Sequence, residues 1–299
     1  MLTHRNALRG AHIAAHGAAI LFGLTGIFGA LIDAGAVVIT FGRAAFAVAA
    51  LAAFALAQGK SLLGGLTRAR LAVLTASGAL LALHWVTFFI AVKSGGVAVA
   101  TLGFASFPAF IAVLDMLVFR ERIGASEGML LALVTLGLVL VTPSFDFGDR
   151  GTVGLAWGVA SGLSFAVLAM LNRRGTRGLD AMQVAFWQNL VVAALLAPFA
   201  LDQAMALRSA ADWVYLALLG VFCTGLAQYL FVRSLDGLDA RSAGMIIALE
   251  PVYAIACAWW LFGEKPSLRM VAGGALIMVA IVLSARGKHT QAQAPAPLM

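Results

Sequence analysis

The chain has 299 residues, of which 62% are hydrophobic and 11% are charged, and its mean hydropathy is +0.99. A soluble protein of this composition would lack the polar groups that cover a water-facing surface, so the composition excludes that class. The net charge of +7 comes from 20 Lys and Arg against 13 Asp and Glu. These charges lie between apolar runs, which indicates an orientation signal in a membrane and argues against a nucleic-acid partner.

Apolar runs of 18 or more residues follow one another along nearly the whole chain. Each is long enough to cross a hydrocarbon core about 30 Å thick. All connections are short, so we predict ten membrane-spanning helices and no soluble domain. The fold class is therefore an all-α integral membrane protein. The expected spans are 14–31, 36–57, 70–92, 97–119, 126–143, 151–171, 181–201, 211–232, 240–262 and 267–285.

The Lys and Arg residues are divided unequally between the two sides of the membrane. With the N-terminus inside, 14 lie on the inner side, five on the outer side and one, Arg43, within a span. The positive-inside rule then predicts a multi-pass protein of the inner (plasma) membrane with both termini cytoplasmic. We expect residues 1–13 to be a cytoplasmic N-terminus. Residues 286–299 are polar and rich in Pro and Ala, which is typical of a disordered tail.

Two stretches of the chain share a pattern at a constant offset of 143 residues. They read "FPAFIAVLDMLVFRERI" and "EPVYAIACAWWLFGEKP". The offset pairs Pro108 with Pro251 and Glu121 with Glu264, so the same spacing from proline to glutamate ends a span twice. We expect both glutamates to be loop and capping residues, since an acid suits the positive end of a helix.

Five spans separate each matched pair, and an odd number of crossings inverts one half relative to the other. The pattern therefore predicts two inverted five-helix repeats around a central cavity, over residues 14–143 and 151–285. Inverted repeats are typical of secondary transporters, whose substrate site lies near the midplane between the halves.

With these motifs in place, residues 14–285 resemble the EamA-type members of the drug/metabolite transporter superfamily. The two quoted stretches carry the resemblance, together with Arg43 in "ITFGRAAFAVAALAAF", which is similar to an arginine common in the family's second span. The resemblance implies an exporter of amino acids or other small metabolites, with the amino-acid exporters of the YddG kind sharing this size and layout. It also implies that spans 1–4 and 6–9 surround the cavity while spans 5 and 10 pack outside it.

Glu250 is the leading candidate for substrate binding. It lies ten residues into its span, about 15 Å deep, where a charge costs roughly 2.5–3.5 kcal/mol and usually faces a cavity or a partner. Its repeat counterpart is Phe107, so the fold itself does not require an acid there. Three roles fit: an anchor for a substrate ammonium, a proton-titrating group, or a structural bond to a neighbouring helix. Tyr253, one turn later, is a candidate donor to the carboxylate.

Other polar and aromatic side chains within spans are weaker candidates. Arg43 fits a substrate carboxylate, or an ion pair with Asp33 or Glu250. His84 and Gln188 suit either the cavity or bonds between helices, and Gln188 aligns with Arg43 across the repeat. The remaining candidates for the lining of the cavity share a mid-span position; they are Phe107, Ser164 and Trp187.

Pro108 and Pro251 lie in the middle of their predicted spans. A proline cannot donate the backbone hydrogen bond of a helix, so each is expected to kink its span. Because the proline recurs in both halves, we predict hinges or cavity-shaping bends, with simple packing as the alternative.

Several other functions are less compatible with the sequence. It has no phosphate-binding GxxxxGK[ST], HExxH or GxSxG motif, so we expect no enzyme, cofactor or metal site. The function that fits best is export of small metabolites, most simply neutral or aromatic amino acids, by alternating access. The expected partners are that solute, membrane lipids and, as a coupling ion, the proton. A drug or nucleotide-sugar carrier is the alternative, and a channel is less compatible.

Overall fold

The computed structural model describes residues 2–119, 125–144, 146–176, 178–205, 207, 209–234, 237–238, 243, 246–247 and 249–287. All regular secondary structure in these residues is helical, which confirms an all-α fold. The elements are α1 (Leu2–Leu31), α2 (Ala36–Ala57), α3 (Arg68–Phe104), α4 (Phe107–Phe119), α5 (Ala125–Val141), α6 (Arg150–Gly175), α7 (Ala181–Met205), α8 (Ala210–Gly220), the π-helical η1 (Val221–Leu226), α9 (Ala227–Ser234), α11 (Glu250–Phe262) and α12 (Leu268–Gly287).

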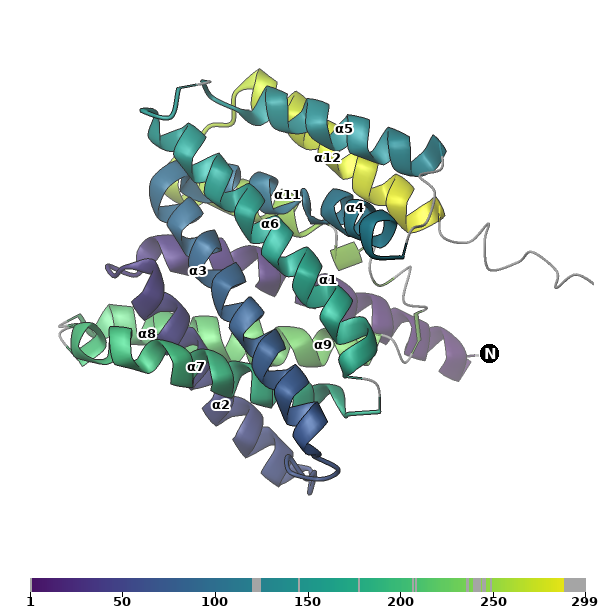
Figure 1. Cartoon of the computed structure of the whole chain (residues 1–299), viewed down its shortest axis with the longest axis vertical. Coiled ribbons are helices and arrows are strands. Elements are labelled where there is room, and N and C mark those ends of the chain that lie inside the picture. The colour runs from purple at the N-terminus through teal and green to yellow at the C-terminus, as the bar shows by residue number, and fades with distance from the viewer. Residues whose placement is uncertain are drawn as a thin grey trace, which may run out of the picture.

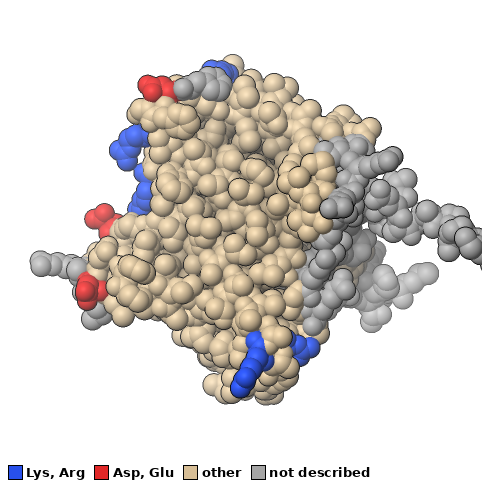
Figure 2. All heavy atoms as spheres, viewed as in Figure 1, with Lys and Arg blue, Asp and Glu red and all other residues tan. Residues whose placement is uncertain are grey.

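The helices have the length and composition of a membrane protein. Six of them are long and apolar enough to cross a bilayer, and shorter apolar helices cover residues 107–118, 128–141 and 268–283. The face drawn in Figure 2 is a broad uncharged surface, with the described charged side chains at its margins. Helix α1 begins and α12 ends on the same side of the bundle (Figure 1). The number of crossings stays a prediction.

The ends of the chain differ from the expected boundaries. Helix α1 begins at Leu2, so most of the segment 1–13, predicted as a separate N-terminus, continues the first span as helix. Its apolar part begins at Leu8. At the other end α12 continues to Gly287, and the rest of the expected tail, 288–299, lies outside the described residues.

The third and fourth predicted spans meet within α3. Gly96, between them, has φ 83° and ψ 171°, a conformation that only glycine adopts at low cost. The carboxylate of Glu264 lies over this turn and accepts hydrogen bonds from the backbone N–H groups of Val97 (3.5 Å) and Ala98 (3.4 Å). Glu264 is thus a capping residue, as predicted, but it caps the second part of α3. Its counterpart Glu121 lies outside the described residues.

Each repeated proline lies at the start of a helix, which differs from the expected kink in a continuous one. Helix α3 ends at Phe104, and Pro108 is the second residue of α4. In the same way α11 begins at Glu250, with Pro251 in its first turn. At these positions the missing N–H costs nothing, because the first turn of a helix has no partner for it.

The two helix starts pack against glycines of neighbouring helices. A Cβ on Gly23 of α1 would lie 3.0 Å from the carbonyl oxygen of Glu250. A Cβ on Gly162 of α6 would lie 2.9 Å from the carbonyl oxygen of Phe104 and 3.3 Å from the backbone nitrogen of Phe107. Only a residue without a side chain lets another helix approach an interrupted backbone this closely.

The contacts between helices are equivalent in the two halves of the chain. Helix α2 packs on α7, its counterpart, and α5 packs on α12. Helix α3 packs along α6, as α1 packs along α9 and α11. Figure 1 shows α5 and α12 side by side at one edge of the bundle, away from α1, α2, α7 and α8. The largest core cluster among the other helices is built mainly on α3, with further buried residues from α2, α8 and α11.

The contact between α3 and α6 depends on glycine. A Cβ on Gly154 would lie 2.5 Å from the Cα of Gly95, and a Cβ on Gly158 would lie 2.9 Å from the carbonyl oxygen of Ala100. The stripe Gly154, Gly158 and Gly162 therefore sets the distance between two backbones.

Substituting Gly154 by Ala should destabilise the fold by about 1–3 kcal/mol, because the backbones of α3 and α6 must separate to admit the methyl group. Thermal unfolding in detergent, followed by loss of the monodisperse species on size exclusion, measures this change. Gly10→Ala is the matched control, since no atom lies within 4 Å of the added Cβ. Equal melting temperatures for the two variants would contradict the close packing.

Candidate functional site

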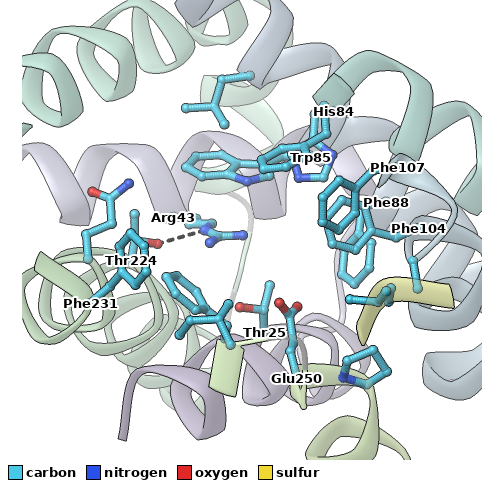
Figure 3. Close-up of a pocket in the computed structure, with 18 residues that line it drawn as sticks. Thr25, Arg43, His84, Trp85, Phe88, Phe104, Phe107, Thr224, Phe231 and Glu250 are labelled. Carbon is cyan, nitrogen blue, oxygen red and sulfur yellow. Dashed lines mark hydrogen bonds between the residues drawn. The ribbon is translucent and has the colours of Figure 1, made fainter. Parts of the chain in front are cut away.

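A cavity of about 470 Å³ lies inside the bundle (Figure 3). One part of its wall is aromatic and comes from α3, α4 and α6: Trp85, Phe88, Phe104, Phe107 and Phe165. The other part carries the polar groups and comes from α1, α2, η1, α9 and α11: Thr25, Arg43, Thr224, Gln228 and Glu250. A mostly apolar cavity of this size with a few convergent polar groups is typical of a small-molecule site.

Arg43 is buried, with only 4% of its surface exposed, and three contacts hold its side chain in place. Its guanidinium carbon lies 3.9 Å from the centre of the Trp85 ring, a cation–π contact. Its Nε donates a 2.7 Å hydrogen bond to Oγ1 of Thr224, and Nη2 donates a 3.5 Å bond to the carbonyl oxygen of Cys223. These bonds use two of the five N–H donors of a guanidinium, so the others are available to a bound anion.

The backbone around Thr224 explains the position of this bond. Thr224 lies in η1, where π-helical turns replace α-helical ones, and its hydroxyl donates to the carbonyl oxygen of Leu219, five residues earlier. Just before η1, a Cβ on Gly220 would lie 2.6 Å from the carbonyl oxygen of Arg43. The span of α8 and η1 therefore lies directly against the backbone of α2 at Arg43.

The carboxylate of Glu250 faces the same space as the guanidinium of Arg43 (Figure 3). The two residues interact electrostatically, but they form no ion pair with each other. No described residue donates a hydrogen bond to the carboxylate. A positive and a negative group thus meet one cavity from α2 and from the start of α11, with room between them.

The polar side chains of His84 and Gln228 also face the cavity. The ring of His84 on α3 lies among Phe88, Phe104 and Phe165, and its Nδ1 contacts the hydroxyl (2.8 Å) and the carbonyl oxygen (3.2 Å) of Ser161 on α6. Gln228 on α9 has a buried Oε1 without a hydrogen-bond partner among the described residues. A buried oxygen that is unpaired is unfavourable, so a ligand with a donor would gain by binding there.

Comparison with known proteins gives the family. The profile of the EamA-like transporter family matches residues 9–142 and again residues 152–286. The chain belongs to the EamA-like transporter family. This membership makes it a multi-pass membrane transporter and not an enzyme.

The relatives of this EamA-like transporter are about 25% identical to it over the aligned part of the chain. An uncharacterised transporter of Archaeoglobus fulgidus is 26% identical over 67% of this chain and 71% of its own. The uncharacterised transporter YxxF of Bacillus subtilis is 26% identical over 70% and 68%. The pseudopaline exporter CntI of Pseudomonas aeruginosa is 25% identical over 75% and 78%. A crystal structure covering 95% of this chain and 99% of its own, at 20% identity and a TM-score of 0.65, shows the same fold.

The structure brings four of the candidate residues of this EamA-like transporter together at the cavity. They are Arg43, His84, Phe107 and Glu250, with the predicted hinge residue Pro251 beside them. The other predicted hinge, Pro108, is buried but does not line the cavity. Of the groups that could bind a metal, no three His, Cys, Asp or Glu side chains cluster in the described part of the chain.

The other four candidates lie outside the cavity wall; three of them bond to other helices or loops, and Ser164 bonds within its own helix α6. Tyr253 bonds through its hydroxyl to Nδ1 of His16 (3.0 Å), so it is not the donor to Glu250. Gln188 donates to the hydroxyl of Ser77 and to Oδ1 of Asn172, both at 2.9 Å. Trp187 donates to the carbonyl oxygen of Leu62 (2.8 Å), and Ser164 to that of Ser161 (2.8 Å).

Sequence reasoning missed three residues that shape the site. Trp85, beside His84, carries the cation–π contact with Arg43, and Thr224 carries the hydrogen bond. Thr25 lines the cavity from α1. The sequence did contain a signal for Trp85. A buried arginine in a membrane needs a partner, and because the predicted spans contain few acids, an aromatic ring was the alternative partner for Arg43. Threonine in an apolar helix gives no such signal.

The hydroxyl of Tyr253 can be tested as a structural group. Tyr253→Phe should lower the free energy of unfolding by about 0.5–1.5 kcal/mol, the contribution of one hydrogen bond. The melting temperature in detergent measures the change. Tyr215→Phe is the control, since no hydrogen bond of that hydroxyl is found within the described part of the chain. If both variants melt alike, the bond to His16 does not stabilise the fold.

Proposed function

We propose that this transporter exports small zwitterionic metabolites, most simply neutral or aromatic amino acids, from the cytoplasm by alternating access of two inverted halves. The observation that carries the proposal is the placement of Arg43 and Glu250 on one cavity without an ion pair between them. An α-carboxylate suits the free guanidinium donors, and an α-ammonium suits the Glu250 carboxylate.

The aromatic wall supports the same proposal. Phe104 and Phe107 stack with ring centres 5.3 Å apart, and Phe165 lies edge-on to both. Such a surface binds an apolar or aromatic side chain while the charged groups hold the amino-acid head. A nucleotide sugar would require several cationic groups for its phosphates, and the cavity offers Arg43 alone among the residues that line it.

The movement is expected to involve the two interrupted spans. In our proposal Pro108 and Pro251 mark the points where α4 and α11 change direction as the halves rock, with lipid around the bundle. Glu250 is the candidate for a proton that is exchanged with the substrate ammonium. Both termini are assigned to the cytoplasm, and the protein to the inner membrane, by the distribution of Lys and Arg.

A second candidate is a larger metabolite. A relative carries the name of a pseudopaline exporter, and a cavity of about 470 Å³ admits solutes larger than an amino acid. The panel of solutes in the experiment below should therefore extend beyond single amino acids.

Purified protein in proteoliposomes should take up amino acids with saturable kinetics and should exchange internal for external solute. Glu250→Gln and Arg43→Gln should each reduce kcat/KM by about 10- to 100-fold, because each removes a charged bond to the substrate. Asp202→Asn, an exposed acid at the end of α7, is the matched control and should leave uptake unchanged.

Three outcomes would contradict parts of the proposal. Flux that does not saturate and shows no exchange would indicate a channel. Uptake that Glu250→Gln leaves unchanged would remove that residue from the mechanism. Uptake that an imposed pH gradient does not alter would argue for facilitated diffusion and against proton coupling.

A further inference from the structure

The hydrogen bonds of His84 define which ring nitrogen carries the proton. The carbonyl oxygen of His84, 3.0 Å from the hydroxyl of Ser161, is able only to accept, so we assign the single hydrogen of that hydroxyl to this bond. Toward Nδ1 of His84 that hydroxyl must therefore accept, and the carbonyl oxygen of Ser161, 3.2 Å from Nδ1, is able only to accept. Both contacts require a proton on Nδ1. In the neutral ring Nε2 then has no proton and is a hydrogen-bond acceptor.

This acceptor has no hydrogen-bond partner in the part of the chain that the structure describes. Both hydrogen bonds of the ring are made by Nδ1, and Nε2 bonds to no described residue. Nε2 is also absent from the fully buried polar atoms without partners, so it retains accessible surface. Since the ring is only 7% exposed and lines the cavity, that surface belongs to the cavity (Figure 3).

The atoms around Nε2 are mainly those of aromatic rings, so Nε2 is an isolated acceptor in an apolar part of the cavity. The ring lies 5.0 Å from Phe104, 5.1 Å from Phe165 and 6.5 Å from Phe88, measured between ring centres. His84 is next in sequence to Trp85, whose ring forms the cation–π contact with Arg43. One polar atom thus lies within the aromatic wall, on the part of the cavity that is not occupied by Arg43 and Glu250.

We propose that Nε2 of His84 accepts a hydrogen bond from the side chain of the substrate, so that the preferred substrates are aromatic or heteroaromatic amino acids with a ring donor. A hydroxyphenyl, indole or imidazole group has such a donor, whereas a phenyl group has none. The inference rests on the proposed function and names the substrate class of that site. A substrate without the donor leaves a buried acceptor unpaired, which is how a site rejects it.

The test compares substrates that differ by one donor. Initial rates of uptake into proteoliposomes give kcat/KM for tyrosine, tryptophan and phenylalanine, and for O-methyltyrosine and 1-methyltryptophan, whose ring donors are blocked. Wild-type protein should prefer tyrosine and tryptophan over the donor-free amino acids by about three- to tenfold, the factor expected for one hydrogen bond.

His84→Phe should remove this preference, lowering the ratio of tyrosine to phenylalanine to about one. His12→Phe is the matched control, because His12 is exposed on α1, and it should keep the wild-type ratio. Because the ratio is internal to each variant, it is insensitive to the amount of folded protein. If His84→Phe does not fold, the methylated substrates still test the donor in the wild type.

The outcomes separate this inference from the proposed function. Transport of amino acids with equal kcat/KM for tyrosine, O-methyltyrosine and phenylalanine overturns the role of His84 and leaves amino-acid export standing. A preference that His84→Phe retains overturns it as well. If wild-type protein transports none of the amino acids, the proposed function fails and this inference fails with it.

Discussion

The burial of one guanidinium determines much of this architecture. Arg43 is charged and nearly inaccessible within a span, a costly arrangement that needs compensation. The compensation comes from three groups on two elements: the Trp85 face on α3, and the Thr224 hydroxyl and the Cys223 carbonyl oxygen on η1. Because these bonds hold only part of the guanidinium, the remaining donors require a polar cavity beside them, and Glu250 balances the charge.

The backbone of the two halves is repeated more closely than their side chains. Gly220 packs on the carbonyl oxygen of Arg43, and Gly78 packs on that of Gln188, the residue aligned with Arg43. The scaffold therefore makes the same close contact twice. Only one of the two aligned positions carries a charge into the cavity, since Gln188 is bonded to Ser77 and Asn172. The backbone contacts that the two halves share determine the fold, and the side chains that differ between the halves determine the chemistry of the cavity.

The same distinction explains what could be predicted from the sequence. The helical fold and the depth of Arg43 and Glu250 follow from apolar runs and from the rise per residue. The depth of Tyr253 and Gln188 within their spans was equally clear from the sequence. The direction of their side chains was not, because it depends on which neighbouring helix packs against each face of a span. The interruptions at Phe107 and Glu250 also depend on neighbours, since the glycines that admit them lie on other helices. The prolines in the sequence indicated where these interruptions lie, but a proline fits both a kinked helix and the start of a new one.

The two charged residues of the cavity belong to opposite halves of the chain, Arg43 on α2 and Glu250 on α11. Any rocking of the halves changes their separation, so a solute bound to both stabilises the arrangement in which both contacts are made. A ligand shifts a conformational equilibrium only by the difference in its affinity for the two states. A zwitterion that bridges Arg43 and Glu250 has such a difference, whereas a solute held by one half alone has none. In the proposed mechanism, the separation of these two charges, which form no ion pair with each other, would couple recognition of a zwitterionic solute to the movement of the two halves.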